Sequence, residues 1–203
     1  PRALKACKSA LGFDPKSGII YNSIGDVLSK SEKYEFAKKA YKQALVLSPK
    51  SALFLNNLGR TLLTQGLFDE AAACFQKSIH FDANFLQAYA NLGFVLQSQG
   101  RFEEAKISFK EAIFRKGDYA LAHRMAVRLQ KAGIDRAWIK QMEKVRETQN
   151  LSLDDNSQLC FAIALAYEKN SDFKKATEYY SLANKFRKLD VKYYLRRDQD
   201  WFG

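Results

Sequence analysis

Residues 52–85, ALFLNNLGRTLLTQGLFDEAAACFQKSIHFDANF, contain the pattern that decides the fold. Apolar side chains recur at three- and four-residue spacing on both sides of Gly66, which is typical of two amphipathic helices joined by a turn. Glycine is suited to the left-handed conformation that often ends a helix. The stretch therefore predicts two antiparallel helices, at about 52–65 and 68–81.

The same pattern returns at an interval of 34 residues, which is the signature of a repeat array. Positions that share a register carry similar residues: Ala3, Ala37, Ala71 and Ala105; Cys7, Tyr41, Phe75 and Phe109; Leu28, Leu62 and Leu96. This predicts first helices at 18–31, 52–65 and 86–99, and second helices at 34–47, 68–81 and 102–115.

Glycine lies inside each predicted first helix, at Gly25, Gly59 and Gly93. A glycine in the middle of a helix costs about 1 kcal/mol relative to alanine. We infer a packing reason: without a side chain at this position, the second helix can approach closely. The alanines of the second helices are small for the same contact, and the aromatic residues four positions later fill the space beyond it.

These residues resemble the tetratricopeptide repeat (TPR) family, with its aromatic residue, Leu-Gly pair, Ala-x-x-x-Phe and closing proline, as at Pro49. The resemblance implies an all-α fold, a right-handed superhelical solenoid of antiparallel helix pairs. Its expected parts form one solenoid domain: the second helix of a truncated repeat at 1–17; repeats at 18–51, 52–85 and 86–119; a degenerate helix pair at 120–156; a repeat at 157–190; and a capping or linker helix at 191–203.

The degenerate pair departs from the pattern because His123, Ala126 and Val127 replace the aromatic residue, leucine and glycine. Its helices are expected at 120–132 and 135–149, around Gly133. In the last segment, apolar side chains are expected to cover the final helix pair, since an unstacked end exposes apolar surface. They are Tyr193, Tyr194, Trp201 and Phe202.

In the TPR family the first helices line a concave groove, so the resemblance implies a peptide-binding site on them. The matching positions are Asn22, Asp26, Asn56, Asn57, Arg60, Gln87 and Asn91. Asn57 and Asn91 hold the place of the asparagine ladder in the repeat region of protein O-glycosyltransferases. Carboxamides can donate hydrogen bonds to, and accept them from, an extended peptide backbone. The alternative is that these are exposed polar residues without a ligand.

The net charge of +11 is concentrated at the two ends of the chain. Residues 1–50 carry ten Lys/Arg and four acids, residues 51–114 five and six, and residues 115–203 eighteen and twelve. A solvated face explains most such charge runs. The sequence therefore favours a protein or peptide partner over a nucleic acid.

Other candidate sites have simpler explanations. Cys7, Cys74 and Cys160 are far apart, as expected for buried thiols rather than a disulfide framework or a zinc site. His80 and His123 lack a catalytic partner pattern, and each is expected to be a surface or packing residue. The stretch DPKSGII at 14–20 is similar to a phosphate loop, but its Pro15 matches Pro49 and predicts a turn between helices. The sequence predicts no catalytic residue, metal or cofactor.

Two functions remain open. The first is a protein-interaction scaffold that binds an extended peptide in the groove. The second is the substrate-docking arm of a larger transferase with its catalytic domain beyond residue 203. The string at 159–188 and the segment KYYLRRDQDWF are similar to the junction in bacterial TPR-containing sulfotransferases, and a protein O-glycosyltransferase is a further alternative. With no long apolar run, the chain is expected to be cytoplasmic and without a membrane span; its oligomeric state stays open.

Overall fold

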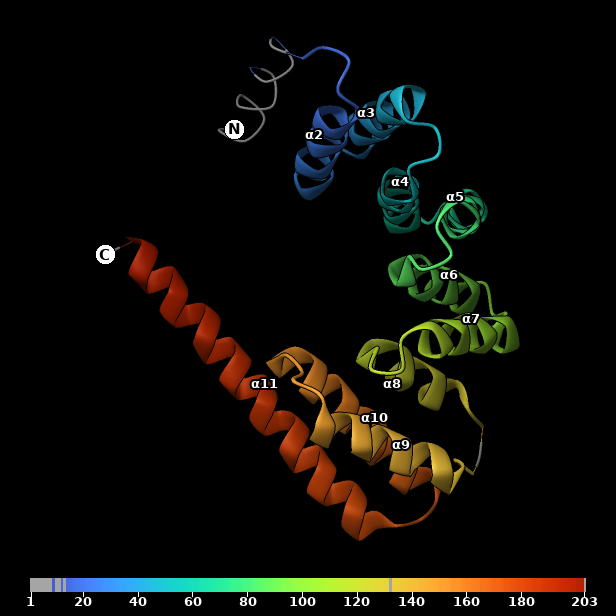
Figure 1. Ribbon diagram of the computed structural model, residues 1–203, viewed down its shortest axis with the longest axis vertical. Helices are drawn as coiled ribbons and strands as arrows, with labels where there is room; N and C mark the ends of the chain where they lie inside the picture. The colour runs from blue at the N-terminus through green and yellow to red at the C-terminus, as the bar shows by residue number, and fades with distance from the viewer. Residues whose placement is uncertain (1–8, 10–11, 13, 132, 203) are drawn as a thin grey trace. The chain divides into compact units, whose positions relative to one another are not determined.

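A computed structural model describes residues 9, 12, 14–131 and 133–202, with backbone only for 192–202. The described residues form α-helices joined by short turns and contain no strand (Figure 1). The chain divides into two compact units, Pro1–Arg101 and Phe102–Gly203. Of the truncated repeat predicted at 1–17, residues 1–8, 10, 11 and 13 lie outside the described residues. None of the described helices is long and apolar enough to cross a membrane.

The described residues of unit 1 (residues 1–101) form two helix pairs and one further helix. They are α2 (Gly18–Lys30), α3 (Tyr34–Leu47), α4 (Ala52–Thr64), α5 (Phe68–Phe81) and α6 (Leu86–Ser98). Helix α2 packs on α3 and α4 packs on α5, while α3 also contacts α4 and α5 contacts α6. These bounds confirm the helices predicted for this part of the sequence to within a residue.

The close approach predicted at the glycines of the first helices is present at Gly25 and Gly59. A Cβ atom on Gly59 would lie 2.7 Å from Cε1 of Phe75, and one on Gly25 would lie 2.5 Å from Cε1 of Tyr41. Both rings are buried, with exposed fractions of 0% for Phe75 and 2% for Tyr41. The aromatic residue of the second helix therefore occupies the volume that a side chain on the first helix would need.

The turns within the helix pairs use the left-handed backbone conformation. Gly66 has a φ of 74° and Gly100 a φ of 76°, as the sequence predicts for glycine at a helix end. The turn between α2 and α3 has Glu32 at the corresponding position, with a φ of 59°. A non-glycine residue in this conformation is uncommon, so the repeat geometry is kept here despite its local cost.

Unit 2, residues 102–203, contains α7 (Phe102–Arg115), α8 (Ala120–Leu129), α9 (Arg136–Thr148), α10 (Leu153–Lys169) and α11 (Phe173–Phe202). Helix α8 ends three residues before the predicted position, and an extended loop leads to α9. The core of this unit gathers buried apolar side chains from α8, α9 and α10, including Val127, Ile139, Met142, Leu159 and Ile163.

The loop between α8 and α9 is held by side chains from the end of α10. The Asn170 carboxamide accepts a hydrogen bond from the Ile134 backbone N–H (2.7 Å) and donates one to the Ile134 carbonyl (2.8 Å). The Lys169 ammonium donates to the carbonyls of Gln130 and Arg128. These bonds satisfy backbone groups that the early end of α8 leaves without helical partners.

His123 fills the position of the repeat's aromatic residue and is fully buried. Its Nδ1 accepts a hydrogen bond from the Trp138 indole N–H at 3.0 Å, and its Nε2 lies 2.8 Å from the Gly117 carbonyl oxygen. The ring is therefore neutral, with its proton on Nε2. Burial lowers the pKa of His123, and the hydrogen bond to Gly117 opposes that shift in part. The expectation of a packing residue is confirmed.

Two further expectations differ in detail. Residues 191–202 continue α11 without a break instead of forming a separate helix, because no glycine or proline interrupts the sequence from Phe173 to Phe202. The side chains expected to form the cap lie outside the described residues. Cys160 is buried, which raises the pKa of its thiol to about 11, but Cys74 is only half-buried. Cys7 also lies outside the described residues.

Candidate functional site on the first helices of unit 1

Three of the predicted groove asparagines are buried: the exposed fractions are 6% for Asn22, 4% for Asn56 and 7% for Asn57. They bond to one another across neighbouring repeats. Asn57 on α4 donates to the carboxamide oxygen of Asn22 on α2 at 3.1 Å, and Asn91 on α6 donates to that of Asn56 at 2.8 Å. The asparagines therefore connect the three first helices of unit 1.

Asp26 ends this row of side chains. One of its oxygens accepts a hydrogen bond from the Asn22 carboxamide at 3.3 Å, and the other accepts one from the Tyr41 hydroxyl at 2.7 Å. Burial, followed by the hydrogen bond to Asp26, raises the pKa of Tyr41 above its usual value. Tyr41 therefore remains a neutral donor, and the carboxylate has two fixed partners.

A link at 3.5 Å between the carboxamides of Asn56 and Asn57 joins the two halves of the row. The row then runs from Asn91 through Asn56, Asn57 and Asn22 to Asp26. Each carboxamide has two N–H donors and an oxygen that can accept twice, so these bonds leave hydrogen-bonding positions for a ligand. Polar groups buried at this depth need partners, which the row supplies.

Beside this row lies a pocket of about 350 Å³. Four predicted groove residues line it: Asp26, Asn57, Arg60 and Asn91. Of the other three, Asn22 and Asn56 lie behind the pocket wall as bonded partners, and Gln87 is exposed but does not line the pocket. The structure thus brings together residues from α2, α4 and α6 around one concave surface.

Sequence reasoning did not identify several residues that line this pocket. Tyr41 was expected only to pack, but its hydroxyl, which Phe75 lacks at the same register, reaches Asp26. Lys30 lies one turn after Asp26 on α2 and contributes a second cation beside Arg60. Thr61 is buried; its hydroxyl donates to the Asn57 carbonyl and accepts a hydrogen bond from the Ser29 hydroxyl at 3.2 Å. The hydroxyl of Tyr41 is the sequence signal that could have indicated the contact with Asp26.

We expect the Asn22–Asn57 bond to stabilise the fold in addition to any role in binding. In a double-mutant cycle of Asn22→Ala and Asn57→Ala, the coupling free energy should be about 0.5–1.5 kcal/mol, since each single change leaves one buried carboxamide without its partner. Urea unfolding of the four proteins gives this quantity. Asn84→Ala, which removes an exposed side chain outside this row, should add independently to Asn57→Ala. If the changes in unfolding free energy are additive in both cycles, the Asn22–Asn57 hydrogen bond does not contribute to stability.

Comparisons with known proteins support the repeat pattern. Two family models described as tetratricopeptide repeat match the chain, one over residues 22–84 and the other over 86–122 and 157–188. No curated protein matches the sequence. Among solved structures, YrrB, described as a TPR protein with an unusual peptide-binding site, is 19% identical with a TM-score of 0.62, covering 91% of this chain and 93% of its own.

Two further structures have the same fold. A MamA protein is 24% identical with a TM-score of 0.58, and the match covers 87% of this chain and 94% of that protein. The first TPR of Spaghetti (RPAP3), bound to an HSP90 peptide, is 16% identical with a TM-score of 0.54, over 57% of this chain and 92% of its own. At these identities the likeness concerns the fold. Since the matched repeats together span well over half of its residues, the chain belongs to the tetratricopeptide repeat family.

Proposed function

We propose that the chain is a protein-interaction scaffold and that the pocket of unit 1 binds an extended peptide. The observation that carries this proposal is the pocket of about 350 Å³ lined by Asp26, Asn57, Arg60 and Asn91. These residues come from three successive first helices, so a bound segment would cross the repeats. Structural relatives described as peptide-binding or peptide-bound support the same class of ligand.

The chemistry of the pocket suits a peptide backbone. Asn57 and Asn91 offer neutral carboxamides, which pair with backbone N–H and C=O groups without reading side chains. Asp26 already accepts two hydrogen bonds, whereas Arg60 and Lys30 line the pocket without an ion pair among the described residues. The pocket therefore also accommodates an acidic side chain or a carboxylate of the peptide.

To test the proposal, a peptide that binds the whole chain is selected from a random 12-residue library. By calorimetry, Asn91→Ala and Arg60→Ala should each weaken its binding about tenfold, the effect of losing a hydrogen bond worth roughly 1.4 kcal/mol. Asn91 and Arg60 suit this test because both are more exposed than Asn57, so the fold is retained. Lys77→Ala, an exposed change on α5, is the matched control.

The proposal is contradicted when the selected peptide binds both pocket variants and wild type with the same dissociation constant. The ionic strength adds a second criterion. Binding through neutral carboxamides should vary little with salt, while a charge-driven contact weakens steeply. Asn91→Ala should therefore lower affinity by the same factor at low and high salt.

The docking-arm hypothesis extends this proposal to a parent enzyme. None of the matched structures described above is a sulfotransferase or a glycosyltransferase, so this role remains a prediction from the sequence. In either setting the groove would hold a protein segment, and the peptide measurements above test that shared step.

A further inference from the structure

A second pocket, of about 380 Å³, lies in unit 2 among α9, α10 and α11. Arg136 and Lys140 of α9, Tyr167 of α10 and Lys175 of α11 line it. We propose that this pocket binds a small phosphate monoester. The site lies outside the groove residues of unit 1 and does not depend on the function proposed for them.

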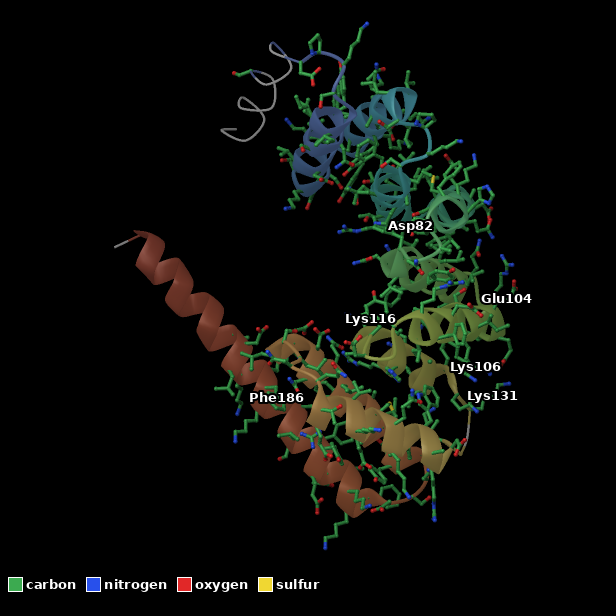
Figure 2. The ribbon with its side chains drawn as sticks, viewed as in Figure 1. Asp82, Glu104, Lys106, Lys116, Lys131 and Phe186 are labelled. Carbon is green, nitrogen blue, oxygen red and sulfur yellow. The ribbon has the colours of Figure 1, made fainter. Side chains whose placement is uncertain are left out.

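The charge of the pocket is the first argument. Arg136, Lys140 and Lys175 line it with a single carboxylate, Asp172. Two other cations of this unit pair with acids: Lys116 lies 3.3 Å from Asp118, and Lys106 contacts Glu103 (Lys106 and Lys116 are labelled in Figure 2). Among the described residues, the side chains of Arg136 and Lys140 have neither an ion pair nor a hydrogen bond.

The carboxylates at the pocket are engaged by other groups. One oxygen of Asp172 accepts a hydrogen bond from the Lys175 backbone N–H at 3.2 Å and so caps the start of α11. Behind the pocket wall, Glu143 accepts bonds from the hydroxyls of Tyr167 (2.8 Å) and Tyr179 (2.9 Å). Counting both acids, the three cations still leave an excess positive charge at the pocket.

The pocket walls are held in place before any ligand binds. Asn170, which lines the pocket, fixes the Ile134 backbone through two hydrogen bonds, at 2.7 and 2.8 Å. The Lys175 ammonium lies 3.3 Å from the Tyr167 hydroxyl and 4.8 Å from the centre of its ring. A preformed site binds with a smaller loss of conformational entropy.

The donor set points to phosphate. A guanidinium presents paired N–H groups that match two phosphate oxygens, and two ammonium groups can neutralise the remaining charge. The partly buried ring of Tyr167 provides apolar surface for the organic part of the ligand. A volume of a few hundred Å³ is within the usual range for small-molecule sites.

The experiment is a calorimetric titration of phenyl phosphate into the whole chain. We expect saturable one-to-one binding, which Arg136→Gln and Lys140→Gln each weaken about tenfold. Lys144→Gln, an exposed change of the same charge on α9, should leave the affinity unchanged. Melting temperatures equal to wild type for the exposed pocket variants exclude unfolding as the cause.

Three outcomes would overturn the proposal. One is the absence of saturable binding, and another is an equal loss of affinity in the Lys144→Gln control, which indicates diffuse charge attraction. The third is benzoate binding more tightly than phenyl phosphate, since the pocket would then be selective for a carboxylate. Weaker binding of inorganic phosphate than of phenyl phosphate would support the apolar contact with Tyr167.

Discussion

Replacement of Gly59 by leucine is expected to lower the free energy of unfolding by roughly 1–3 kcal/mol or more. Even the first carbon of the new side chain would lie 2.7 Å from the Phe75 ring, closer than van der Waals contact allows. Phe75 is fully buried, and protein interiors are packed with few voids that could accept a displaced ring. Helices α4 and α5 must then separate, which removes contacts along the whole pair.

Urea unfolding monitored by circular dichroism measures this effect. Ala73→Leu is the matched control because Ala73 is an exposed position on α5, so the larger side chain meets solvent. A protein of this size loses about 2–4 °C in Tm per kcal/mol, so the thermal shift should also be measurable. An unchanged free energy of unfolding in Gly59→Leu would mean that the helices do not pack through this glycine.

The agreement at Gly59 explains why the helix pairs could be predicted from the sequence. The repeats at 18–51, 52–85 and 86–119 share glycine in the first helix and alanine with an aromatic residue in the second, and Gly66 and Gly100 end the first helices of the last two. Local propensity and packing then favour the same structure, which is when sequence reasoning works best. The turn at Glu32 shows that the pattern holds even where one signal is missing.

The candidate site was less predictable because it depends on pairings between repeats. The sequence indicates that asparagines face the groove, but not that Asn57 bonds to Asn22 instead of remaining exposed. Side-chain rotamers decide this, and their choice depends on three helices together. The same reason explains why the contact between Tyr41 and Asp26 was not expected.

For the degenerate pair, the sequence predicted a departure from the repeat pattern but not the hydrogen bonds that hold the loop and His123. The loop is held by Lys169 and by Asn170, which lies thirty-six residues from its partner Ile134. Such a long-range pairing has no periodic signal. Likewise, the position of His123 could be inferred from the repeat register, while its hydrogen bonds to Trp138 and Gly117 could not.

His123 should make the stability of the protein depend on pH near neutrality. Burial lowers the pKa of His123 in the native state below its ordinary value of 6.5. Between these two values the unfolded chain binds one more proton than the native chain, so stability falls as the pH falls. The full stabilising effect is present above pH 6.5 and is lost progressively below it, by at most about 1.4 kcal/mol per pH unit.

His123→Leu separates this titration from the other groups. The substitution leaves the Trp138 indole N–H and the Gly117 carbonyl without their partner, which should cost about 1–3 kcal/mol at neutral pH. Its free energy of unfolding should then change less than that of wild type between pH 7.5 and 5.5. This range stays above the ordinary carboxyl value of 4.5, where Glu35 and Glu103 begin to contribute.

Urea unfolding at several pH values compares the two proteins, and His80→Leu is the matched control because that histidine is exposed. If wild type and His123→Leu lose stability in parallel as the pH falls, the inference that His123 is buried and neutral in the native state is wrong. If only His80→Leu removes the pH dependence, the titrating group lies on the surface. Protonation of His123 would place a second proton on Nδ1, facing the Trp138 N–H, and would break the hydrogen bond between them. The pH dependence of stability should therefore depend on this hydrogen bond.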